Sequence, residues 1–124
     1  MPTSRFEELH VWRESFALAL SISKICRGFP SHERYDLVPQ LRRAARSVHN
    51  NLAEGVGSQT AATFLRYVYI ALGSMSEVEN HLLIARAEGY ITDATCVELR
   101  ERAGKVRGLL LLLAASLRKA SRRQ

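Results

Sequence analysis

The chain has few of the residues on which disulfide-stabilised or metal-binding proteins depend. Its two cysteines, Cys26 and Cys96, are too few for a disulfide framework and lack a paired metal-binding spacing. Two cysteines permit one disulfide, but both stand at apolar positions of helical segments. We therefore interpret them as reduced core residues of a cytoplasmic protein.

Long hydrophobic runs are also missing. The N-terminus carries no apolar segment that could serve as a signal peptide. The longest apolar run, Leu109 to Ala115, is much shorter than the roughly 20 residues that a helix needs to cross a bilayer. No membrane association is expected.

Recognisable catalytic motifs are absent as well. The four histidines lie in different segments, with no spacing typical of metal ligands. Glu77 and His81 are four residues apart, but the paired Glu-x-x-His motif of di-iron bundles is missing. Nucleophile motifs, phosphate-binding glycine loops and the dinucleotide fingerprint do not occur, and Gly55-Val56-Gly57 follows a helical pattern instead of a strand. We expect no catalytic residues, no metal and no cofactor.

What the sequence does contain is apolar periodicity typical of long helices. From Ala61 to Ala85 apolar residues recur at alternating spacings of three and four. Similar stripes predict helices over about 8–27, 36–54, 60–88 and 93–119. Asp36, either Ser58 or Thr60, and Thr92 are the predicted N-caps, and Gly55 with Gly57, and Gly89, are the predicted ends of the second and third helices. No strand pattern occurs. We expect a single all-α domain over residues 1–124, an up-down-up-down antiparallel four-helix bundle.

Three of the four predicted helices, the first, third and fourth, have more apolar residues than one core stripe requires. Such a surplus favours a homo-oligomer, although a tight monomer with half-buried side chains is the alternative. Gly104 and Gly108 are four residues apart in the fourth helix, where glycine lowers helix propensity. We expect Gly104, Gly108, Leu109 and Leu112 to lie at a helix-packing or oligomer contact.

The net charge of +6 and the pI near 9.9 favour a polyanionic partner, although charge can serve solubility alone. Arg42, Arg46 and His49 share one face of the second helix, with Arg43 beside them. Arginines on a rigid face bind phosphates, but they could instead form ion pairs with Glu54, Glu77 or Glu79. This face has no aromatic residue for base stacking. The C-terminal segment adds further basic candidates: Arg118, Lys119, Arg122 and Arg123.

Several motifs together resemble one protein family. They are QLRRAA at 40–45, NLAEG at 51–55, FLRYVYIALGS at 64–74 and GYI at 89–91. These resemble the bacterial four-helix-bundle proteins encoded in intervening sequences of large-subunit ribosomal RNA genes. The accessory variability proteins of diversity-generating retroelements are similar to the same family. The resemblance extends to about Leu113.

The resemblance implies a barrel-shaped homopentamer with a basic surface that contacts nucleic acid and, in the accessory branch, a reverse transcriptase partner. Arg46 and His49 depart from the family pattern, which usually has a small apolar residue and a proline there. We therefore expect a non-enzymatic, oligomeric basic scaffold that binds RNA, DNA or a nucleic-acid-processing partner such as a reverse transcriptase. The alternative is an oligomeric protein-protein interaction module with no nucleic-acid binding.

Overall fold

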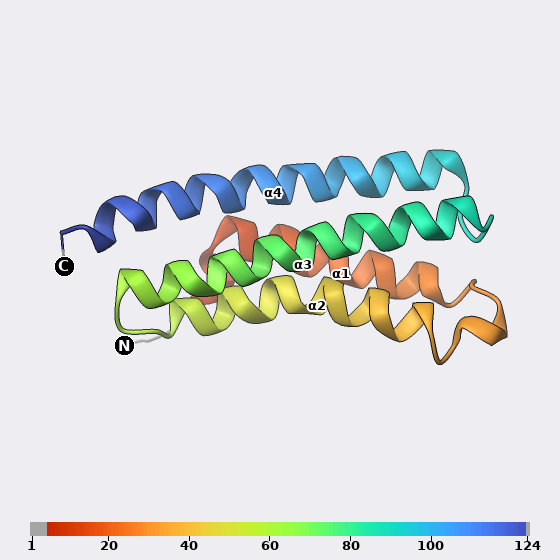
Figure 1. The fold of residues 1–124 in the computed structure, drawn as a ribbon, viewed down its shortest axis with the longest axis horizontal. Helices are drawn as coiled ribbons and strands as arrows, with labels where there is room; N and C mark the ends of the chain where they lie inside the picture. Colours follow the sequence, from red (N-terminus) through yellow and green to blue (C-terminus); the bar gives the residue numbers. More distant parts are fainter. Residues whose placement is uncertain (1–4, 124) are drawn as a thin grey trace.

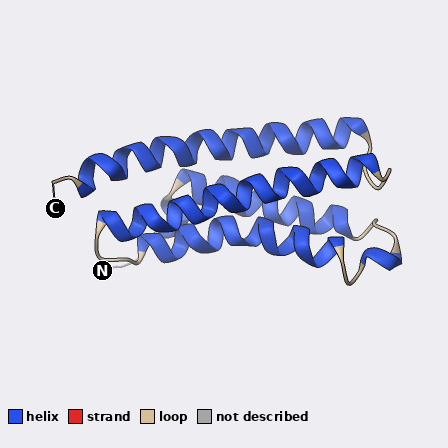
Figure 2. Cartoon of the chain, viewed as in Figure 1, coloured by secondary structure: helices blue, strands red, loops and turns tan. Residues whose placement is uncertain are grey.

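All the regular structure in the described part of the chain is helical. The computed structural model describes residues 5–123 and contains no strand in that range (Figure 2). Each long helix begins and ends within two residues of its predicted range. In chain order the elements are the short 3-10 turn η1 (Phe6–Glu8), α1 (His10–Cys26), the 3-10 turn η2 (Ser31–Glu33), α2 (Leu37–Val56), α3 (Ala61–Ala87) and α4 (Asp93–Ser121).

The four long helices lie side by side along the long axis of the molecule. α2 packs against α1 and α3, and α4 packs against α3 and α1. Figure 1 shows α1 and α3 running in one direction and α2 and α4 in the other, with the C-terminal end of α4 extending past its neighbours. Each helix thus has two neighbours, which leaves one outward face per helix.

The core consists of the predicted apolar stripes. Leu41, Leu52, Leu82 and Leu110 are completely buried, and both cysteines are buried in the same core as free thiols. Burying one side chain of this size stabilises a fold by about 1.5–3 kcal/mol. These stripes therefore fix which face of each helix points outward.

Two of the predicted helix caps, and the predicted end of α3, agree with the structure. The side-chain oxygens of Thr60 and Thr92 each accept a hydrogen bond from the backbone N–H three residues later, at 3.1 Å. Gly89 has φ +79° directly after α3, a conformation that only glycine adopts at little cost. The Tyr90 N–H donates back to the Ala85 carbonyl at 2.8 Å, which completes the glycine-based helix ending.

Two details of α2 differ from the prediction. Asp36 precedes the helix but does not cap it; its carboxylate accepts from the Gln40 side chain, and Glu33 accepts from the Leu37 N–H instead. Gly55 does not end α2 but lies inside it. A Cβ atom there would come within 2.5 Å of the Phe64 ring, so glycine is needed for α3 to approach this closely.

The surplus apolar side chains are exposed on the expected helices. Within residues 5–123 nine large hydrophobic residues are exposed, and none of them lies on α2. They are Phe16 and Leu20 on α1, Tyr69, Ile70 and Ile84 on α3, Val97, Leu111 and Leu112 on α4, and Tyr35 in the segment before α2. Among the described residues, no helix is long and apolar enough to cross a membrane.

The glycines of α4 face open space within the protomer. A Cβ atom at Gly104 or Gly108 would meet no atom within 4 Å. Nearby, Leu109 is half-buried, whereas Leu112 is 70% exposed. The four residues therefore make no close helix contact through the glycines inside one protomer, and their contact with a second copy stays a prediction.

Candidate nucleic-acid interface

α2 presents its arginines on the side opposite its buried stripe. Leu41, Ala44 and Val48 anchor the helix in the core. Because an α-helix turns once every 3.6 residues, Arg43 and Arg46 are carried outward, whereas Arg42 lies at the edge and is half-buried. The exposed face of α2 is thus basic.

None of these three arginines forms an ion pair within residues 5–123. The acidic residues that could have neutralised them are engaged elsewhere or remain apart. Glu79 pairs with Arg100 and Arg107 of α4, and Glu77 contacts His81 on its own helix at 3.3 Å. Ion pairs that would neutralise the arginines of α2, the alternative considered from the sequence, are therefore absent among the described residues.

The arginines border two hollows in the surface, which we call the α2 hollows. The larger, about 400 Å³, is lined by Pro39, Arg42, Arg43, Arg46, Ser47, Asn50 and Asn51. The smaller, about 160 Å³, is lined by Phe16, Ala19, Leu20, Ser23, Arg46, His49 and Asn50. Both include Arg46 and Asn50, and neither is lined by a carboxylate, so the surface offers donors with no competing acceptor charge.

His49 differs from the arginines in its environment. Its ring packs edge-on against Phe16, with centroids 5.2 Å apart, and against Trp12 at 6.1 Å. Burial, and secondarily the positive charge of Arg46, lower the pKa of His49 below its ordinary value near 6.5. His49 is therefore neutral at pH 7 and adds a hydrogen-bonding ring instead of a positive charge, contrary to its expected role as a basic residue.

Aromatic side chains do lie beside the basic face, although α2 itself provides none. Trp12 and Phe16 of α1 stack with ring centroids 4.7 Å apart, and Phe16 remains 37% exposed. The sequence signal was the spacing of four between these two residues, which places both on the same side of α1. Only the packing of α1 against α2 shows that this side meets His49.

Arg42 occupies a special position because its Nε atom is buried without a hydrogen-bond acceptor. A buried donor without a partner costs about 1–3 kcal/mol. Its guanidinium lines one α2 hollow and also a separate cavity nearer the N-terminal end of α2. The side chain is thus held between two surface openings.

The C-terminal basic residues do not join this face. Arg118 donates to the Tyr69 hydroxyl at 2.9 Å, and Arg118, Lys119, Arg122 and Arg123 are all exposed at the end of α4. Figure 1 shows this end extending beyond the rest of the molecule, away from the N-terminal half of α2. The C-terminal basic residues therefore form a surface separate from the basic face of α2. No group of three metal-ligating side chains occurs among residues 5–123.

The fold and this face define a class: a small protein of four long helices with a basic, unpaired arginine surface on one of them. Comparison with known sequences gives the class a family. The sequence model of the 23S rRNA-intervening sequence proteins matches residues 7–111. The chain belongs to this family, as the motifs in α2 and α3 predicted.

A solved structure shares the fold. It is a protein of unknown function from the S23 ribosomal protein family of Bacteroides thetaiotaomicron, with a TM-score of 0.78 and 22% sequence identity. The alignment covers 84% of this chain and 97% of the other. At that identity the likeness shows the fold alone. No curated protein matches the chain.

Proposed function

We propose that this protein is a non-enzymatic, cytoplasmic scaffold that binds the phosphates of RNA or DNA through the basic face of α2. The observation that carries the proposal is that Arg42, Arg43 and Arg46 all line the larger α2 hollow and form no ion pair within residues 5–123. An arginine guanidinium binds phosphate oxygens in a bidentate manner, and a rigid helix keeps several of them in fixed positions.

The proposed assembly multiplies this face. We infer an up-down-up-down antiparallel protomer that forms a homopentamer through the apolar outward faces of α1, α3 and α4. Support comes from the exposed Leu111 and Leu112 of α4, since apolar patches on a protein surface often mark interfaces. α2 carries no large exposed apolar residue, so its arginines stay free in such an assembly.

The same arrangement suits a protein that works with a nucleic-acid enzyme. A reverse transcriptase is the partner that the wider family resemblance suggests. Its template and product would supply the phosphates for the α2 face. The competing function, a protein-protein interaction module, shares the apolar faces but requires no phosphate binding.

The test is a salt titration of binding to a fluorescein-labelled DNA duplex, followed by fluorescence anisotropy. Each phosphate contact contributes about 0.9 to the slope of log affinity against log salt. Arg43→Ala with Arg46→Ala is expected to lower the magnitude of the slope by about 1–2 per bound protomer and to weaken binding at low salt. Because neither arginine is ion-paired, the thermal melt should change by less than the equivalent of about 0.5 kcal/mol.

Arg66→Ala with Arg86→Ala is the matched control, since it removes the same charge from exposed positions of α3. An equal loss of slope in both double variants would mean that net charge binds the duplex and that the α2 face does not. Absence of binding by the wild type at low salt would reject the nucleic-acid function and leave the interaction module.

A further inference from the structure

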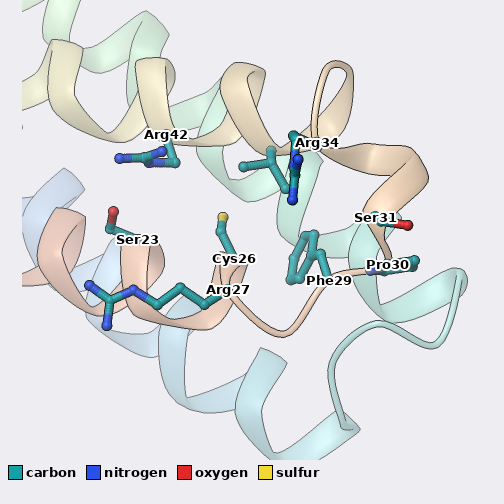
Figure 3. A pocket seen from close by; sticks show the side chains of 9 residues that line it. Ser23, Cys26, Arg27, Phe29, Pro30, Ser31, Arg34 and Arg42 are labelled. Atoms are coloured by element: carbon teal, nitrogen blue, oxygen red, sulfur yellow. The ribbon is translucent and has the colours of Figure 1, made fainter.

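A third opening lies between the C-terminal end of α1 and the N-terminal end of α2. It has a volume of about 360 Å³, and we call it the Phe29 cavity. Figure 3 shows Arg42 and Arg34 on one side, the Cys26 thiol and the Phe29 ring opposite, and Arg27 extended along α1 on the side of Ser23. Nine residues line it: Ser23, Cys26, Arg27, Phe29, Pro30, Ser31, Arg34, Val38 and Arg42.

The charge around this cavity has one sign. Arg27, Arg34 and Arg42 line it, no carboxylate does, and none of the three forms an ion pair within residues 5–123. Burial raises the pKa of the Cys26 thiol, an effect that Arg42 only partly opposes. The thiol thus stays neutral at pH 7, and the wall supplies no negative charge.

The cavity also offers hydrogen-bond donors. The Ser23 and Ser31 hydroxyls line it, and in Figure 3 the Ser23 hydroxyl points toward the Arg42 guanidinium. The buried Nε of Arg42 has no hydrogen-bond acceptor among the described residues. Three guanidinium groups and two hydroxyls suit a doubly charged phosphate, which has three terminal oxygens to accept hydrogen bonds.

The remaining wall is apolar. Phe29 is only 8% exposed, and Pro30 and Val38 lie beside it. The volume exceeds what one phosphate group fills and falls in the range of small-molecule sites, about 300–1,000 Å³. A ligand that matches both parts carries a phosphate on an apolar or aromatic group.

We propose that the Phe29 cavity binds the phosphate monoester of a small organic molecule, of the size and chemistry of a nucleoside monophosphate. The phosphate lies among Arg27, Arg34 and Arg42, and the organic group packs against Phe29. This site is distinct from the α2 hollows: it shares Arg42 with the larger one and Ser23 with the smaller one, and neither Arg43 nor Arg46 lines it. It does not depend on nucleic-acid binding by Arg43 and Arg46.

The experiment is isothermal titration calorimetry of the full chain with adenosine 5′-monophosphate, adenosine and inorganic phosphate at constant ionic strength. The monophosphate is expected to bind at least tenfold more tightly than either of the other two. Arg27→Ala with Arg34→Ala should weaken its binding at least tenfold. Arg43→Ala with Arg46→Ala, which removes the same charge from the α2 hollows, should change it less than threefold.

A second measurement on the wild type removes the dependence on variants. Amide chemical shifts in a nitrogen-15 spectrum should respond to the monophosphate at Gly28, Phe29 and Val38, not along 46–50. Equal affinity for adenosine or inorganic phosphate, or no heat at millimolar ligand, would overturn the proposal. An equal loss in the two double variants would also overturn it. In each case the duplex titration remains an independent test of the α2 face.

Discussion

The outward faces of α2 and α4 are opposites in chemistry. α2 presents Arg43 and Arg46 to solvent and no large apolar side chain, whereas α4 presents Leu111 and Leu112, of which Leu112 is 70% exposed. Both helices bury regular stripes of similar composition, such as Leu41 and Leu52 on one and Leu99 and Leu110 on the other. The two helices therefore differ in their outward faces and not in their buried stripes.

This difference indicates which kind of partner each face suits. An exposed leucine cluster gains free energy when another apolar surface covers it, at roughly 25 cal/mol for each Å² removed from water. An unpaired arginine cluster gains most from an anion, and its attraction weakens as salt rises. We therefore propose that the α4 face takes part in assembly and that the α2 face binds phosphate, and separate substitutions test the two proposals.

The largest effect is expected at the α4 face. Leu111→Glu with Leu112→Glu places two charges on the proposed interface, and we expect the oligomer to dissociate to the 13.9 kDa protomer at micromolar concentration. Light scattering measures the mass. Ala94→Glu, at an exposed position near the opposite end of the same helix, is the control and should leave the oligomer intact. A wild-type mass near 14 kDa would itself reject the assembly.

A smaller effect, on the free energy of unfolding, is expected from a substitution where α2 packs against α3. Gly55→Ala adds a methyl group 2.5 Å from the Phe64 ring, which forces the α2–α3 contact apart and should lower the free energy of unfolding by about 1–3 kcal/mol. Chemical denaturation measures it. Gly108→Ala is the contrast, since no atom lies within 4 Å of the new methyl group in the protomer. There the better helix propensity should stabilise the protomer by up to about 1 kcal/mol.

If Gly108 packs against a second copy in the oligomer, the bulkier Gly108→Leu should lower the assembled mass. An increased melting temperature with unchanged mass would show that this glycine faces solvent in the assembly too. Stabilisation by Gly55→Ala would show that Phe64 moves freely, contrary to the close α2–α3 contact.

The smallest expected effect is a change in how stability depends on pH. It arises where η2 contacts the connection between α3 and α4. The Tyr90 hydroxyl donates to Glu33 at 2.7 Å and lies 3.1 Å from His32. The hydrogen bond from Tyr90 holds the pKa of Glu33 below its ordinary value near 4.5, and its carboxylate raises the pKa of Tyr90 to about 12. Glu33 thus stabilises the fold above its unfolded-state pKa, and this is lost as pH falls through the folded-state pKa.

The contribution of Tyr90 to stability depends on pH in the opposite direction. It is complete below the ordinary pKa near 10 and is lost as pH rises through about 12. Tyr90→Phe removes the hydrogen bond that lowers the pKa of Glu33. Because of this, the loss of stability on acidification below about pH 4.5, measured by thermal melts, should become smaller. Tyr35→Phe, at a tyrosine that is 87% exposed, should leave the profile unchanged. An unaltered acid profile in Tyr90→Phe would exclude this bond as its source.

The helices and the family followed from the sequence because both depend on local patterns. Apolar spacing located the four helices, and Thr60, Thr92 and Gly89 mark ends whose capping needs only nearby residues. The prediction that Asp36 caps α2 was wrong. The carboxylate of Glu33, four residues before Leu37, accepts the hydrogen bond from the Leu37 N–H instead. The 3-10 turn η2 places Glu33, and not Asp36, within hydrogen-bond distance of this N–H.

The candidate site was less predictable because it depends on contacts between helices. The arginines were found from α2 alone, but the neutral state of His49 requires its burial against Phe16 of another helix. The Phe29 cavity combines Arg27 and Arg42 from α1 and α2 with Arg34 from the segment between them. The close glycine contact within the protomer, at Gly55, was not predicted from the sequence, because it depends on where Phe64 of α3 packs; a contact of Gly104 and Gly108 with a second copy stays a prediction.

The contact between Gly55 and Phe64 also bears on the alignment of two helices. If α2 turned about its axis so that Glu54 or Val56 faced α3 at this point, the side chain would lie where the Phe64 ring now fits. The ring fits where Gly55 faces α3, so this contact favours the present alignment of α2 on α3. Arg46 lies nine residues away, two and a half helical turns, on the same rigid rod. A buried, uncharged glycine thus contributes to where the arginines of α2 are placed.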